Sequence, residues 1–173
     1  NILLQKEAQN KNYLLIIFAG MIIGFFALRK FISTREGRRR YEGLLFKLPV
    51  FGEFFKVLIF ERFTSEMATL VESGVPILYS LEIAEHSVGN LIIGDVIKDV
   101  KDSVREGKPL SVPLENSGFF DPMAVQMVAI GEEIGELSNM FKRLNTFYQE
   151  YLDTFLTRFT TLFEPIMLIF MGA

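Results

Sequence analysis

Apolar residues recur at the 3.6-residue spacing of an α-helix through most of this chain, and no segment shows the two-residue alternation of a β-strand. The first stripe predicts a helix that ends at Ser73-Gly74, with Pro76 just beyond it. A glycine directly after the last turn, followed by a proline, is typical of a helix C-terminus. The residues of this stripe are Phe60, Phe63, Met67, Leu70 and Val71.

The pattern predicts a second and a third helix after this turn. The apolar face of the second helix consists of Ile77, Leu81, Ala84 and Val88. The third helix begins after a candidate N-cap, Asn90, and ends where Gly107 and Pro109 interrupt the pattern. The stripe of the third helix consists of Ile93, Val96, Ile97, Val100 and Val104.

Residues 110–120 are expected to form a loop or a short helix. Asp121-Pro122 then provides an N-cap followed by a proline at the first helical position, which predicts the start of a fourth helix. The stripe of this fourth helix consists of Met123, Met127, Ile130 and Ile134. A final helix starts near Glu136, and its stripe consists of Leu137, Met140, Phe141, Leu144, Tyr148, Tyr151, Phe155 and Phe159.

Residues 131–137, GEEIGEL, place two glycines and three glutamates where the last two helices meet. A glycine inside a helix costs about 1 kcal/mol relative to alanine, so two of them need a reason. Gly135 is expected to end the fourth helix and join it to an antiparallel neighbour. Gly131 stays inside the helix, where the missing side chain lets a neighbouring helix pack closely.

Two apolar segments are candidates for membrane spans. The run from Asn12 to Leu28 is uncharged and almost wholly apolar, and Phe31 and Ile32 extend it to residues 12–32. The alternative is a buried core helix. Residues 161–173 are expected to begin a second span, cut short by the end of the chain, so the sequence is interpreted as a piece of a longer protein.

Charge is distributed unevenly along the chain. Residues 29–40 hold six basic residues and one acidic residue, a local net charge of +5, so the remainder carries −8 of the total −3. Basic residues flank membrane spans on the cytoplasmic side and attract anionic lipid; the alternative is a site for an acidic partner. The acidic remainder disfavours nucleic-acid binding. The basic residues are Arg29, Lys30, Arg35, Arg38, Arg39 and Arg40.

No catalytic constellation is recognisable in the sequence. The chain has no cysteine and one histidine, His86, which is expected to be a surface or packing residue. No Walker-type phosphate loop occurs, so a process that needs ATP would depend on a partner for hydrolysis. We therefore expect no catalytic residue and no cofactor.

Acidic residues are the remaining candidates for a site. Glu132, Glu133 and Glu136 could bind a hard cation, but a solvated helix-terminal face is the favoured interpretation, and no metal site is predicted. Glu164, followed by the helix-perturbing Pro165, lies where the second span begins. A carboxylate there either has a specific role or stays hydrated at the interface.

Five segments together resemble the second cytoplasmic domain of the type II secretion F family, the inner-membrane platform proteins of type II secretion systems and type IV pili. Their order and spacing match the family over about residues 45–170. The segments are KLPVFGEF (47–54), RFTSEMATLVESGVPILYSLEIA (62–84), REGKPLS (105–111), FFDPMAVQMVAIGEEIGEL (119–137) and LFEPIMLI (162–169).

The resemblance implies an all-α fold, an antiparallel bundle of about six helices attached to transmembrane helices at both ends. Residues 1–11 would be periplasmic, 12–32 a transmembrane helix, 33–160 the cytoplasmic bundle and 161–173 the start of the next span, in a multi-pass protein of the bacterial inner membrane. The family's motif positions are Gly74, Val75 and Pro76, then Gly131, Glu132, Gly135, Glu136 and Leu137, then Glu164 and Pro165.

The resemblance also implies a non-enzymatic function. The platform would couple a hexameric assembly ATPase to the extraction of pilins or pseudopilins, contact other inner-membrane assembly proteins, and work as a homo-oligomer. Charge on the bundle, at Glu132, Glu133 and Glu136, is expected to select basic partners. A transporter or permease fragment is the alternative, but the first span lacks the polar lining that transport requires. A membrane-anchored enzyme is disfavoured further.

Overall fold

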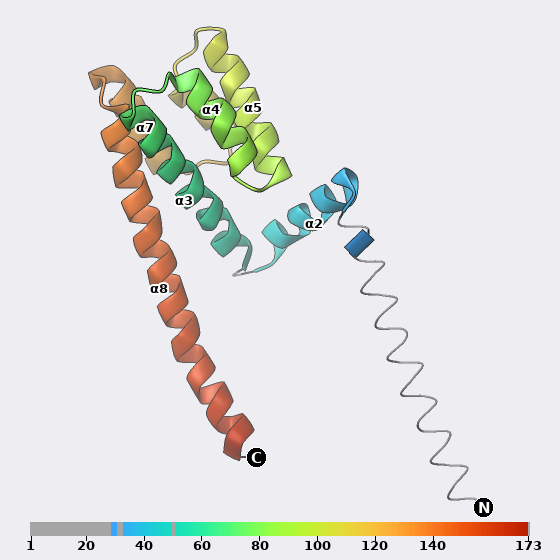
Figure 1. Ribbon diagram of the computed structural model, residues 1–173. Helices are drawn as coiled ribbons and strands as arrows, with labels where there is room; N and C mark the ends of the chain where they lie inside the picture. Colours follow the sequence, from blue (N-terminus) through green and yellow to red (C-terminus); the bar gives the residue numbers. More distant parts are fainter. Residues whose placement is uncertain (1–28, 31–32, 50, 173) are drawn as a thin grey trace, which may run out of the picture. The chain divides into compact units, whose positions relative to one another are not determined.

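A computed structural model describes residues 29–30, 33–49 and 51–172 of the chain (Figure 1). The chain divides into two compact units, residues 1–41 and residues 42–173. The described residues form helices and no strand, which confirms the predicted all-α bundle. The helices are α2 (Arg35–Lys47), α3 (Phe51–Glu72), α4 (Ile77–Ser87), α5 (Leu91–Arg105), α6 (Ser111–Asn116), α7 (Pro122–Ile134) and α8 (Leu137–Gly172).

The two longest helices, α3 and α8, pack against each other in antiparallel orientation. Near the start of α3, the Phe54 ring stacks on Phe155 with centroids 4.7 Å apart. Near its end, Phe63 meets Phe141 edge-on at 6.1 Å. Later positions on α3 therefore meet earlier positions on α8. In Figure 1, α8 continues well past the first turn of α3 toward the C-terminus.

Aromatic side chains close the core where the other helices join this pair. The Phe60 ring lies 5.0 Å from Phe119, 5.2 Å from Phe120 and 5.3 Å from Tyr148. Phe119 and Phe120 come from the segment between α6 and α7, so this connecting segment contributes side chains to the core. Other fully buried core residues are Phe63, Met67, Leu81, Ile93, Ile97, Leu110, Leu114, Phe141 and Leu144.

The predicted helix ends are confirmed. Asn90 caps α5 by accepting a hydrogen bond from the Ile93 N–H at 3.1 Å. Asp121 caps α7 in the same way, accepting from the Ala124 N–H at 2.8 Å, with Pro122 at the first helical position. Gly74 ends α3 with φ at 79°, a conformation that favours glycine. The segment 110–120 contains the short helix α6.

The prediction for the buried face of α7 is wrong. The face toward the bundle is made of the small residues Ala124, Val128 and Gly131. The predicted stripe points outward, with exposed fractions of 38% for Met123, 50% for Ile130 and 58% for Ile134, and only Met127 is partly covered. At Gly131 on this inner face, α8 lies too close to α7 to admit a side chain.

Gly131 shows how close that approach is. A Cβ atom added at this position would lie 2.8 Å from Cγ of Met140 and 3.2 Å from the Cα of Leu137. Contacts this short between carbon atoms are repulsive, and the Leu137 atom belongs to the backbone. The structure therefore confirms that Gly131 is in the helix interior because a neighbouring helix packs against it.

The predicted membrane spans are largely outside what the structure describes. Residues 12–28 are not described, and of the first span only Arg29 and Lys30 are. Among the described residues, no helix combines the length and the apolar character needed to cross a membrane. Residues 161–172, predicted to begin the second span, form the C-terminal part of α8, which runs without interruption from Leu137 to Gly172.

We predict that Gly131→Ala lowers the free energy of unfolding by about 1–3 kcal/mol, because the added methyl group overpacks the α7–α8 contact. Chemical denaturation of the purified protein, followed by circular dichroism, measures the change. Gln126→Ala, an exposed change on the same helix, is the control and is expected to stay within about 0.5 kcal/mol of the wild type. Equal stability of the two variants would contradict the close approach.

Candidate functional site

The turn between α7 and α8 gathers most of the predicted site residues. Gly135 has φ at 74°, and the N–H of Gly135 and that of Glu136 both bond to the Gly131 carbonyl, the latter at 2.8 Å. This double hydrogen bond satisfies backbone groups that a helix end leaves unpaired. The Glu136 carbonyl then accepts the first bond of α8, from the Met140 N–H at 3.1 Å.

A second motif turn lies at the same end of the bundle. The ion pair between Glu72, the last residue of α3, and Lys142, in the second turn of α8, places these helix ends together. Gly74 and Pro76 follow Glu72 directly in the turn to α4. We call the residues Gly74, Pro76, Gly131, Glu132, Glu133, Gly135 and Glu136 the motif pole. Glu164 and Pro165 lie far along α8, at its other end.

The structure gives Glu132 an internal role that the sequence did not predict. Its carboxylate accepts hydrogen bonds from the backbone N–H of Leu110 and from the Ser111 N–H, the latter at 2.9 Å. It also accepts from the Ser111 hydroxyl at 2.8 Å. Glu132 is half-buried and caps the N-terminus of α6, so it is not part of a solvated face.

Glu133 and Glu136 are exposed. The Glu136 carboxylate accepts a hydrogen bond from the side chain of Asn139, three residues on in α8. The acidic surface at the motif pole is therefore made by two of the three predicted glutamates. Among the described residues, no group of three acidic or histidine side chains is arranged to hold a metal ion.

Asp121 has one local partner and one partner across the bundle. One carboxylate oxygen caps α7, and the other accepts a hydrogen bond from the Tyr148 hydroxyl on α8. Burial, together with this hydrogen bond to a carboxylate, raises the pKa of Tyr148 far above its usual value. The phenol therefore keeps its proton, and the bond, at any physiological pH.

Sequence reasoning missed two other charged groups that order the helices. Glu42 is buried and accepts a hydrogen bond from the Leu91 N–H at 2.7 Å, which caps α5 from 49 residues away. No local pattern could reveal such a bond. Lys101 pairs with Glu85 at 2.6 Å between α5 and α4. Its position, four residues after the buried Ile97, was a signal, since a charge on an apolar face needs a partner.

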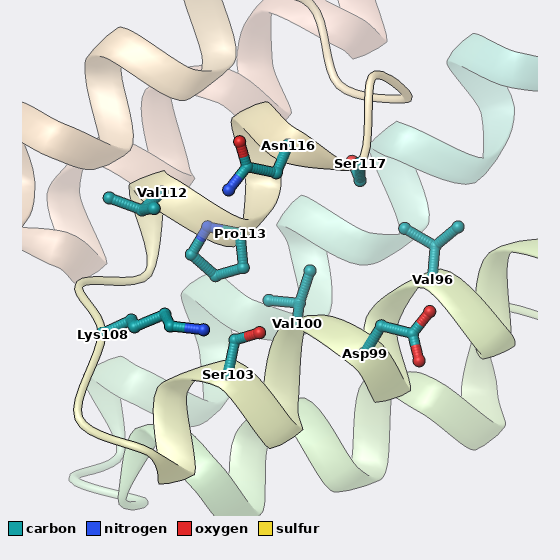
Figure 2. Close-up of a pocket in the computed structure, with 9 residues that line it drawn as sticks. All are labelled: Val96, Asp99, Val100, Ser103, Lys108, Val112, Pro113, Asn116 and Ser117. Atoms are coloured by element: carbon teal, nitrogen blue, oxygen red, sulfur yellow. The ribbon is translucent and has the colours of Figure 1, made fainter.

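The remaining predicted residues lie in other segments of the chain. The six basic residues of 29–40 are exposed and belong to the unit formed by residues 1–41. His86 is exposed on α4. A groove of about 350 Å³ lies between α5 and α6, with Val100 and Pro113 in its floor and Asp99, Ser103 and Lys108 at its rim (Figure 2). The Lys108 ammonium is 3.1 Å from the Glu106 carboxylate.

Comparison with known proteins gives the family. The family model described as "Type II secretion system (T2SS), protein F" matches residues 63–173, more than half of the chain. The chain belongs to this family. The match contains the motif pole, the whole of α7 and the whole of α8.

Curated relatives come from both pilus and secretion systems. The chain is 37% identical over 149 residues, 86% of its length, to a type IV pilus assembly protein PilC of Thermus thermophilus. It is 39% identical over 155 residues, 89% of the chain, to a type II secretion system protein F of Pseudomonas aeruginosa. Each alignment covers 37% of the relative, so the chain spans less than two fifths of these proteins.

We predict that Glu132→Ala lowers the free energy of unfolding by about 1–3 kcal/mol, because it leaves the Leu110 and Ser111 N–H groups without their partner. Glu133→Ala, the neighbouring exposed residue, is the matched control and is expected to change stability by less than about 0.5 kcal/mol. Denaturant titration of both variants compares them. A Glu132 variant as stable as the Glu133 variant would show that the cap is dispensable.

Proposed function

We propose that the chain is the cytoplasmic bundle, with adjoining membrane segments, of a non-enzymatic platform protein in a bacterial inner membrane. The platform couples a cytoplasmic hexameric ATPase to the extraction and polymerisation of pilins or pseudopilins, together with other inner-membrane assembly proteins. The names of the relatives support a role in pilus assembly or secretion. The observation that carries the proposal is the polarity of the bundle along α8.

One end of that polarity is the motif pole, with Glu133 and Glu136 exposed. The α8 helix has 36 residues, which corresponds to about 54 Å at a rise of 1.5 Å per residue. The motif pole and the apolar C-terminal run of α8 are therefore well separated. A surface that must meet a soluble ATPase belongs at the end away from the membrane, where its charges stay hydrated.

The other end carries exposed apolar side chains. Just before α3 and at its first residue, the exposed fractions are 48% for Leu48 and 45% for Phe51. On α8 they are 49% for Leu156 and 40% for Phe159, and the rings of Phe51 and Phe159 touch edge-on at 6.2 Å. Lys47 and Arg158, both exposed, adjoin this cluster in sequence. Apolar side chains beside basic ones are typical of a membrane interface.

We expect Leu156 to lie at the lipid surface. The chain contains no cysteine, so Leu156→Cys gives it a single labelling site, once any cysteines elsewhere in the full-length protein are replaced by serine. An environment-sensitive fluorophore on this cysteine should shift to the blue when the protein is reconstituted in vesicles of phosphatidylcholine and phosphatidylglycerol. It should also resist an aqueous quencher.

Ile134→Cys is the matched control, since Ile134 is also apolar and exposed but lies at the motif pole. Its label should remain fully quenchable. Equal quenching at the two positions would contradict the proposed orientation.

The coupling itself is tested by charge reversal. We expect the variant Glu133→Lys with Glu136→Lys to retain about tenfold less of the assembly ATPase on purified membranes, because rim charges govern encounter with a basic partner. Pilus or secretion output should fall with it. Glu132 is left intact, because its carboxylate caps α6.

Glu82→Lys, which reverses an exposed acid on α4, is the control and should behave as the wild type. Wild-type ATPase retention and wild-type output in the double variant would reject the coupling role of the motif pole.

A further inference from the structure

We propose that the outward face of α7 is a docking surface for a basic amphipathic helix of a partner protein. The docking face consists of Met123, Met127, Ile130 and Ile134, and it deepens the proposed function by stating which partner chemistry this end of the bundle selects. Three features carry the inference, namely the register of the face, its cause in the packing of α7, and its charge.

The docking face has the register of a helix–helix contact. Its four side chains lie at spacings of four, three and four residues, so they form one line along α7. The line is about 17 Å long at 1.5 Å per residue, which corresponds to three turns of an opposing helix. Helices that dock in this way are anchored at positions spaced by three and four residues.

The exposure of this face follows from the opposite side of α7. Ala124, Val128 and Gly131 hold α7 close to the bundle, which leaves the larger residues outside. Ile130 is 50% exposed and Ile134 58% exposed, although a helix normally buries its bulkiest apolar side. An exposed apolar line of this length on a well-packed helix is typical of an interaction surface.

The charge around the docking face determines the occupant. Residues 109–141, which include α6, α7 and the start of α8, contain five acidic residues and no lysine, arginine or histidine. The two lysines that bound this stretch are engaged, Lys108 with Glu106 and Lys142 with Glu72. Glu133 and Glu136 remain exposed beside Ile134. Charge complementarity therefore favours a docked helix that carries lysine or arginine beside its apolar face.

A second copy of this chain fits the surface less well. A twofold interface presents the same patch from both copies, so Glu133 and Glu136 of each copy would add to a common acidic interface. A lipid surface fits less well too, since an anionic headgroup layer repels this acidic stretch. A basic helix satisfies both the apolar line and its charged flank.

The test is site-specific photo-crosslinking in cells that express the full-length protein. A photoreactive amino acid replaces Ile130, and the crosslinked peptide is identified by mass spectrometry. We expect a segment of another protein that has apolar residues at helical spacing and a net positive charge. Ile83 on α4 is the matched control position, since it is also an isoleucine and is 43% exposed; it should not capture this segment.

Changes elsewhere on the docking face should weaken the capture. We expect Met123→Ser with Ile134→Ser to lower the crosslink yield from position 130 by about tenfold or more, because two apolar contacts with the docked helix are lost. The melting temperature should stay that of the wild type, since both side chains are exposed. A crosslink to a second copy, to lipid or to a segment without basic residues overturns the proposal, as does an unchanged yield or no crosslink.

The outcome is distinguishable from a failure of the proposed function. If deletion of the full-length protein leaves pilus assembly and secretion intact but position 130 still captures a basic helix, the platform role fails and the docking face stands. If deletion abolishes assembly but position 130 captures something else, the docking face fails alone.

Discussion

The antiparallel contact between α3 and α8 is the interaction on which the rest of the bundle depends. It begins with the rings of Phe51 and Phe159, continues through the stacked rings of Phe54 and Phe155, and ends near the ion pair between Glu72 and Lys142. Aromatic rings bury large apolar areas and prefer defined geometries, so they fix both the distance and the register of the pair. The turns that follow α3 and precede α8 are thereby brought to the same end.

Carboxylates then position the shorter helices on this frame. Glu42 caps α5, Glu132 caps α6, and Asp121 caps α7 while holding the Tyr148 hydroxyl. The first backbone N–H groups of a helix lack partners within the helix and favour negative charge. A carboxylate from a distant segment that accepts from them therefore links that segment to the helix. Acidic residues in this protein therefore divide into those that hold the bundle together and those, such as Glu133, that face solvent.

The helix α7 connects this internal order to the outer surface. Gly131 and two other small residues let it lie close on α8, and the same packing turns Met123, Ile130 and Ile134 outward. The acidic stretch that surrounds α7 then gives the exposed line a charge preference. In the proposed arrangement, stability and recognition belong to opposite faces of one helix, so the GEEIGEL segment carries both Gly131, which the close packing requires, and exposed acids.

The sequence by itself determined α3, α4, α5, α7 and α8, the ends marked by caps and glycines, and the family resemblance, but it did not predict α2. Asn90, Asp121 and Gly135 act through neighbours three or four residues away, so local patterns suffice to predict them. Only the tertiary structure decided which face of α7 is buried and that Glu132 is a cap. The buried face of α7 depends on how closely the neighbouring helix approaches. The Glu132 cap depends on partners some twenty residues away in the chain. Apolar periodicity records that a helix has an apolar side, but the space beside its neighbour selects the side that is buried.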